Sequence, residues 1–259
     1  MLAGCEKGDA EAWQVFLSRF SPITYRLLHV YAPKLDESTQ KAVWKEALQA
    51  LTANDYQQMR DFDHQAEREF LMDLKWFVLG LAAGHTSESA GRANSSAEEI
   101  STSLKGKSIA HLEIILLALA GYSPADIEKV YAVPAALVGA ALAPPTSENS
   151  AGEIISLKPE GWLQVLPEIR SQNTPECTPR RTFVRILDGQ ASWNDKNVAE
   201  THMVGCLHCL ETWASLREID YLRRDTPPLS PSDVEGYLEL LPVAAAVTSR
   251  TWMSKLLGR

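Results

Sequence analysis

The chain lacks any long apolar run. The longest stretch, "IILLALAG" near 114–121, falls well short of the ~20 residues that span a bilayer. We therefore expect no membrane span and a cytoplasmic location. Cysteine is also scarce, with four in 259 residues. In a cytoplasmic chain, so few cysteines point to metal or redox use before structural disulfides.

Positive charge is limited as well. The chain has 25 Lys and Arg against 33 Asp and Glu, which gives a net charge of −8. Such a chain gains little from counterion release on nucleic acid, so DNA binding would require a local basic patch. A Gly-rich phosphate loop, a nucleophile elbow and a paired-carboxylate motif are all missing from the sequence. We therefore do not expect an enzyme.

Strand-like alternation is weak everywhere, whereas helical spacing of apolar residues recurs, so the sequence predicts an all-α fold. Helices are predicted over 9–31, 37–53, 67–84, 109–120, 135–142, 178–188 and 193–224, with two more beginning at Pro124 and near residue 231. Stretches rich in Ser, Ala, Gly and Pro indicate linkers. The predicted units are 1–85, 108–145 and 176–225, with linkers at 86–107 and 146–175 and a C-terminal helical tail at 226–259.

The segment "THMVGCLHCLETW" (201–213) contains three potential metal ligands: His202, Cys206 and Cys209. An α-helix turns about 100° per residue, so one helix would place these side chains within roughly 60° of one another. Zinc takes four such ligands in a tetrahedron, and a fourth must come from elsewhere in the chain. Cys177 precedes His202 by 25 residues, with the turn "LDGQAS" between them. Two antiparallel helices joined there would return Cys177 to the metal.

Other interpretations of these residues remain. Cys5 is the other remaining thiol, and His208 is a competing imidazole that points away from the shared face. The thiols could also be small buried hydrophobes, with His202 an ordinary surface residue. The spacing nevertheless favours the metal site.

The stretch "CTPRRTFVRILDGQASWNDKNVAETHMVGCLHC" (177–209) resembles the zinc-binding anti-sigma fold. That family has a Cys or His first ligand, a "YLDGEL"-like turn and then H-x3-C-x2-C. The resemblance implies Cys177, His202, Cys206 and Cys209 as the ligands. It also implies a small helical module that binds a sigma factor. Four protein ligands leave no open position, which is typical of a structural zinc ion.

The N-terminal part is similar to region 2 of extracytoplasmic-function sigma factors, through "GCEKGDAEAWQVFLSRF" and the apolar helix "FLMDLKWFVLGLAAG". The helix-turn-helix pattern over 109–143 resembles region 4 of the same family. The side chains that would bind DNA are absent from this helix pattern. Residues 110–145 include one Lys or Arg, Lys129, and "PAALVGAALA" has no polar side chain. We interpret Trp44 and Trp76 as core or partner-facing rather than base-stacking residues.

The sequence thus predicts a transcription regulator of the sigma/anti-sigma type: a degenerate sigma-like part fused to a zinc module. It would act by protein–protein contact with a sigma factor, an anti-sigma factor or RNA polymerase core. Contact between its own sigma-like and zinc-binding parts is also expected. The alternatives are a working sigma factor autoinhibited by its zinc domain, and an all-α scaffold outside transcription. For the tail, packing on the body is favoured over a membrane-surface helix.

Overall fold

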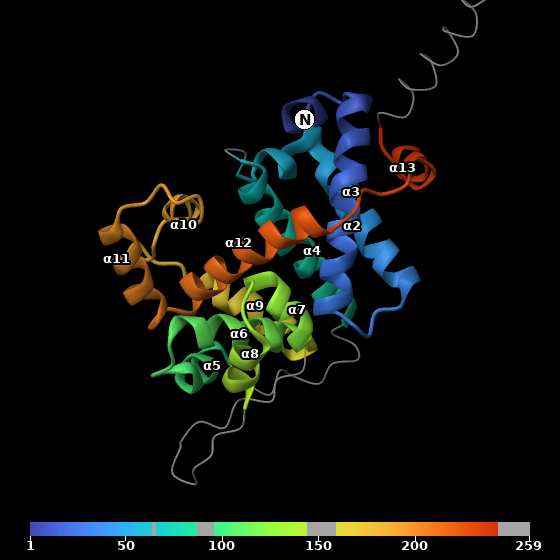
Figure 1. Ribbon diagram of the computed structural model, residues 1–259. Coiled ribbons are helices and arrows are strands. Elements are labelled where there is room, and N and C mark those ends of the chain that lie inside the picture. Colours follow the sequence, from blue (N-terminus) through green and yellow to red (C-terminus); the bar gives the residue numbers. More distant parts are fainter. Residues whose placement is uncertain (64–65, 87–95, 144–158, 243–259) are drawn as a thin grey trace, which may run out of the picture. The chain divides into compact units, whose positions relative to one another are not determined.

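The computed structural model describes residues 1–63, 66–86, 96–143 and 159–242, and these residues form thirteen helices and no strand (Figure 1). The all-α prediction is confirmed. The helices are α1 Leu2–Cys5, α2 Ala10–Tyr31, α3 Glu37–Arg60, α4 Glu67–Thr86, α5 Ala97–Leu104, α6 Ile109–Ala120, α7 Pro124–Tyr131, α8 Ala135–Leu142, α9 Pro159–Ser171, α10 Arg180–Leu187, α11 Trp193–Met203, α12 Leu207–Asp225 and α13 Pro231–Leu238. Within this described part of the chain, no helix has both the length and the apolarity to cross a membrane.

The chain divides into two compact units. The first comprises Met1–His29, Leu35–Ala82 and the chain from Arg223 onward, and the second comprises Val30–Lys34 and Ala83–Leu222. The predicted helix-turn-helix segment and the predicted zinc module therefore belong to one unit. Helix α13, predicted as part of a separate tail, belongs to the first unit, and residues 243–259 of that tail lie outside the described residues.

Aromatic side chains form the core of the first unit. Phe16 lies with its ring centroid 4.9 Å from those of Trp13 and Phe20 and 6.0 Å from that of Phe70. Trp44 is fully buried, and its indole N–H donates to the Ser21 hydroxyl at 3.0 Å. Large buried rings of this kind dominate core energetics, so they fix how α2, α3 and α4 pack. The core interpretation of Trp44 is confirmed, and Trp76 is also buried.

Helix α3 is longer than predicted and is interrupted. The sequence predicts an end at residue 53, and regular helical geometry does stop there: Ala53 is extended, and Asn54, Asp55 and Tyr56 have φ between 49° and 61°. The helix then resumes to Arg60, whose guanidinium pairs with the Asp55 carboxylate at 2.9 Å. Asn and Asp tolerate left-handed backbone better than most residues, which explains a break at this point.

Both predicted linkers contain a helix, which corrects the prediction of linkers over 86–107 and 146–175. Helix α5 begins with a capping box in which Ser96 and Glu99 each bind the other's backbone N–H. Helix α9 buries a row of apolar side chains: Trp162, Leu163, Val165, Leu166 and Ile169. The two helices are linked where the Ala97 N–H donates to the Glu168 carboxylate at 3.2 Å. The polar composition of the flanking residues masks these short apolar patterns.

Helices α6, α7 and α8 follow the predicted bounds closely. Gly121 ends α6 in the left-handed conformation with φ of 110°. Ser123 then caps α7 by accepting the Asp126 N–H at 3.2 Å, with Pro124 in the first turn. Helix α8 buries only Val138 and Ala141.

Candidate metal centre

Two of the four predicted ligands lie in helices, and the other two lie in the segments that precede α10 and α12. Cys177 lies just before α10, His202 lies in the last turn of α11, and Cys206 lies between α11 and α12. Cys209 lies in the first turn of α12. Helices α10 and α11 pack against each other, joined by the predicted "LDG" turn (Figure 1).

The single helix predicted over 193–224 is wrong in one respect, because it is broken at residues 204–206. The Gly205 N–H donates to the His202 carbonyl at 3.0 Å and closes the turn, and α12 restarts with the Leu210 N–H donating to the Cys206 carbonyl at 3.0 Å. Glycine is a poor helix former, which accounts for the break at "VGC". The H-x3-C-x2-C spacing therefore assembles its ligands through a turn rather than along one helix face.

The turn brings all four side chains together. One potential ligand atom from each of Cys177, His202, Cys206 and Cys209 lies within 4.8 Å of the other three. The Sγ atoms of Cys177 and Cys206 are 3.8 Å apart. Cys209 is buried and the other three are partly exposed, so the cluster lies at the edge of the core. Three thiols and an imidazole at this spacing could hold a metal ion.

The cysteine thiols shift one another's pKa values. Hydrogen bonding from the Cys209 thiol, with smaller contributions from Cys177 and His202, lowers the pKa of Cys206 to about 4 against the opposing effect of burial. The same hydrogen bond, together with burial, raises the pKa of Cys209 above its usual range. One thiolate is therefore stabilised at the expense of its neighbour. A cation is needed before several thiolates can coexist at this distance.

His202 Nε2 is buried and has no hydrogen-bond partner among the residues that the structure describes. A buried polar atom left in this state costs about 1–3 kcal/mol, and such atoms are rare enough in proteins to require an explanation. A metal ion bound at Nε2 satisfies it.

The competing residues are placed elsewhere. His208 faces away from the cluster, with Nδ1 3.3 Å from the Ile169 carbonyl oxygen of α9. Cys5 lies in the first unit, where burial raises the pKa of its thiol to about 12. Around the cluster itself, the Thr174 N–H approaches the Cys177 sulfur at 3.4 Å, a donor of the kind that supports a metal-bound thiolate.

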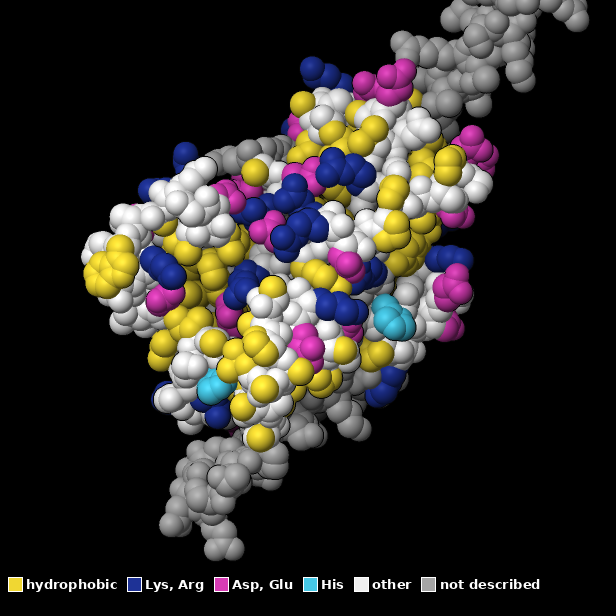
Figure 2. Space-filling view, viewed as in Figure 1, with side chains coloured by type: hydrophobic (Ala, Val, Ile, Leu, Met, Phe, Trp, Pro, Cys, Tyr) yellow, Lys and Arg dark blue, Asp and Glu magenta, His cyan; other side chains and the backbone are white. Residues whose placement is uncertain are grey.

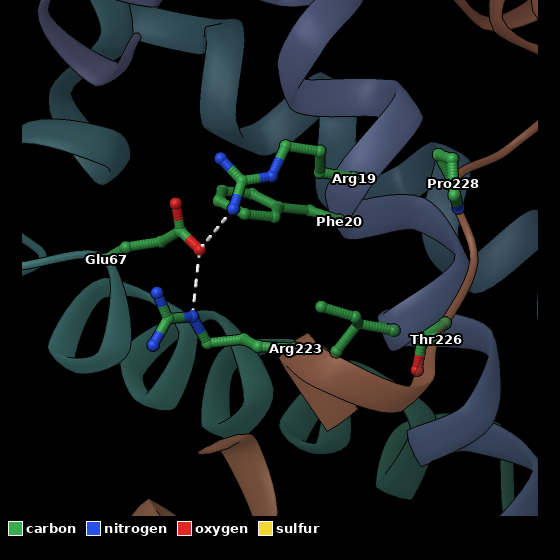
Figure 3. A pocket seen from close by; sticks show the side chains of 7 residues that line it. Arg19, Phe20, Glu67, Arg223, Thr226 and Pro228 are labelled. Carbon is green, nitrogen blue, oxygen red and sulfur yellow. Dashed lines mark hydrogen bonds and ion pairs between the residues drawn. The ribbon is translucent and has the colours of Figure 1, made fainter. Parts of the chain in front are cut away.

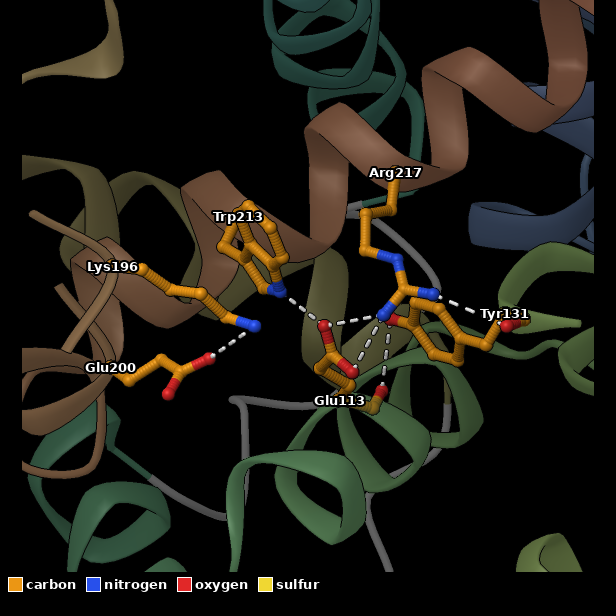
Figure 4. Close-up of polar contacts among 6 residues, drawn as sticks. All are labelled: Glu113, Tyr131, Lys196, Glu200, Trp213 and Arg217. Atoms are coloured by element: carbon orange, nitrogen blue, oxygen red, sulfur yellow. Dashed lines mark hydrogen bonds and ion pairs between the residues drawn. The ribbon is translucent and has the colours of Figure 1, made fainter. Parts of the chain in front are cut away.

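A second cluster of polar contacts joins α12, the helix that carries Cys209, to α6 and the end of α7 (Figure 4). Arg217 of α12 donates to both carboxylate oxygens of Glu113 in α6 at 2.9 Å. The Trp213 indole N–H donates to the same carboxylate. Arg217 also donates to the Tyr131 carbonyl at 3.2 Å and lies 4.4 Å from the centroid of the Tyr131 ring.

This ion pair is a feature that the sequence patterns did not reveal. Burial raises the pKa of Glu113, while Arg217 and the Trp213 N–H oppose that rise. A signal did exist, because Glu113 is the one acidic residue within the apolar helix "IAHLEIILLALA". A lone carboxylate in such a helix requires a buried partner. The expected contact between segments 108–145 and 176–225 is therefore present.

Comparison with protein-family models, with curated proteins and with solved structures found no match to this chain.

Proposed function

We propose that this chain is a transcription regulator of the sigma/anti-sigma type, acting by protein–protein contact, with a structural zinc ion in the module at 176–225. The observation that carries the proposal is the convergence of Cys177, His202, Cys206 and Cys209 within 4.8 Å. This ligand set is the one that the resemblance to the zinc-binding anti-sigma fold implies. The assignment of residues 1–145 as a degenerate sigma-like part rests on the resemblance of their helix pattern to that of sigma factors.

The donor set fits zinc. Two thiolates at a Zn–S distance of about 2.3 Å and a tetrahedral angle lie about 3.8 Å apart, which matches the 3.8 Å between the Sγ atoms of Cys177 and Cys206. Zinc supplies the positive charge that lets all three thiols ionise, and four protein ligands leave no position for a substrate. Bound to these four ligands, the ion would cross-link the segment before α10, the end of α11 and the start of α12.

The chemistry of α8 supports a protein partner over DNA. A helix that reads base edges needs side chains with hydrogen-bonding groups. Helix α8 has the sequence "AALVGAAL", and its exposed positions are Ala135, Ala136, Gly139 and Ala140. On the face shown in Figure 2, Lys and Arg side chains are interspersed with Asp and Glu. Small side chains on α8 suit close approach of another helix.

The contact between α6 and α12 supports the regulatory part of the proposal. The buried pair of Glu113 and Arg217 ties the helix-turn-helix segment to the helix that begins beside the metal cluster. We infer that the helix-turn-helix segment, held by this ion pair, contacts proteins. A partner protein that breaks the ion pair would free this segment from α12.

The test uses the zinc-loaded full chain against RNA polymerase core and a panel of sigma and anti-sigma factors from the same organism. We expect a stable complex with at least one of them and no retention of promoter DNA. Ala136→Arg should weaken that complex, whereas Asn197→Arg, at an exposed position of α11, is the matched control. Promoter-specific transcription with core would instead support an autoinhibited sigma factor. If no partner binds, the transcription role is wrong.

A further inference from the structure

The first unit contains a small cavity with charged groups at one end (Figure 3). Its volume is about 250 Å³, and it is lined by residues of α2, α4 and the end of α12 with the segment that follows. The lining residues are Arg19, Phe20, Ile23, Glu67, Arg223, Thr226 and Pro228. None of them takes part in the metal centre.

Two guanidinium groups share a single carboxylate oxygen at this cavity. Arg19 donates to Glu67 Oε1 at 2.8 Å, and Arg223 donates to the same oxygen at 2.9 Å (Figure 3). The lining therefore carries two positive charges and one negative charge. A guanidinium has five N–H donors, and Arg19 uses one of them on Glu67. The lining thus offers a net positive charge with donors in the fork geometry that matches carboxylate and phosphate.

The rest of the lining combines apolar side chains with one hydroxyl. Phe20 is fully buried and Ile23 is 4% exposed, and Pro228 adds a further apolar wall. Thr226 contributes a hydroxyl that accepts a hydrogen bond from Arg26 at 2.9 Å. Figure 3 shows Arg19, Glu67 and Arg223 on one side and Thr226 and Pro228 on the opposite side. A few convergent polar groups beside apolar walls are the usual features of a small-molecule site.

We propose that this cavity binds a small organic oxyanion, with its carboxylate or phosphate head at Arg19 and Arg223 and a short apolar body beside Ile23 and Pro228. Glu67 acts as the internal counterion that holds the two guanidiniums in place when the site is empty. The anionic head group of the ligand competes with Glu67 for the two guanidinium groups. This proposal is independent of the zinc centre and of the transcription role.

The test is isothermal titration calorimetry of the full chain with four probes: inorganic phosphate, acetate, hexanoate and hexyl phosphate. We expect the six-carbon probes to bind more tightly than the bare anions, and the preferred head group identifies carboxylate or phosphate. Arg19→Gln should weaken binding by about tenfold or more, because it removes a charge-assisted contact. Glu67→Gln should strengthen it, because the competing carboxylate is gone.

The opposite signs of these two substitutions separate binding from structure, because a purely structural triad would be damaged by both. Arg60→Gln, at an arginine paired with Asp55 outside the cavity, should leave the affinity unchanged. Circular dichroism shows whether each variant is folded. If Arg19→Gln does not fold, the direction of the change in Glu67→Gln decides. Absence of saturable binding to every probe, or affinity unaltered or lowered in Glu67→Gln, overturns the proposal.

Discussion

Replacing Arg217 by Met removes the positive charge that neutralises a buried carboxylate. Glu113 keeps 7% of its side-chain exposure and Arg217 keeps 25%, and two N–H···O contacts of 2.9 Å join them. Breaking a buried ion pair by removing one partner costs about 3–5 kcal/mol, because the other charge stays buried. Arg217 is a quarter exposed, so water can partly replace it. We therefore expect a loss of about 3 kcal/mol in the free energy of unfolding.

The loss should depend on pH in a defined direction. Burial already raises the pKa of Glu113, and Arg217 opposes the rise, so Arg217→Met raises this pKa further. A carboxyl group with a raised folded-state pKa destabilises the fold fully above that pKa and not at all below the unfolded value. The difference between wild type and variant should therefore be greatest near neutral pH and should shrink as the pH falls through the folded pKa toward about 4.3.

Urea denaturation followed by circular dichroism, at neutral and at acidic pH, measures both effects. Lys129→Met is the matched control, since it breaks an exposed pair with Asp126 in the same unit and should cost less than about 1 kcal/mol. The double variant Glu113→Gln, Arg217→Met should recover part of the loss, because the buried charge is gone. A cost for Arg217→Met no larger than for Lys129→Met, or a loss that stays constant on acidification, would refute the reasoning.

Three further substitutions test local features of the fold. Ala132→Gly should raise the free energy of unfolding by about 0.5–1 kcal/mol in urea titration, because Ala132 ends α7 with φ of 52°; a destabilised variant would contradict this. Ser192→Ala should cost about 1 kcal/mol in the same assay, since it removes the cap of α11 that binds the Asp195 N–H; no change would show that the cap is unimportant. Ile169→Ala should cost about 2–4 kcal/mol, because Ile169 is fully buried in α9; tolerance of this change would mean that α9 does not belong to the core.

The sequence predicts α6 and α7 well because their apolar spacing and caps are strong local signals. Ser123 and Pro124 mark the start of α7, and Gly121 marks the end of α6. The helices within the predicted linkers were missed for a compositional reason. The Ser-rich sequence before helix α5 dominates any window wide enough to detect the periodicity of its residues.

The candidate site was predictable in its members but not in its geometry. Ligand spacing identifies His202, Cys206 and Cys209, yet it cannot show that Gly205 breaks the helix between them. The pairing of Glu113 with Arg217 joins residues 104 positions apart. Such a contact depends on tertiary packing, and periodicity along the chain carries no information about it.

The most direct test of the central claim is the metal content of the purified full chain, compared with that of Cys177→Ser and Cys206→Ser. We predict about one zinc ion per chain, retained in the control Cys5→Ser and lost in both ligand variants. The control thiol lies in the other unit, outside the cluster. No zinc in the wild type, or zinc unaffected by Cys177→Ser, would contradict the four-ligand centre and the zinc module built on it.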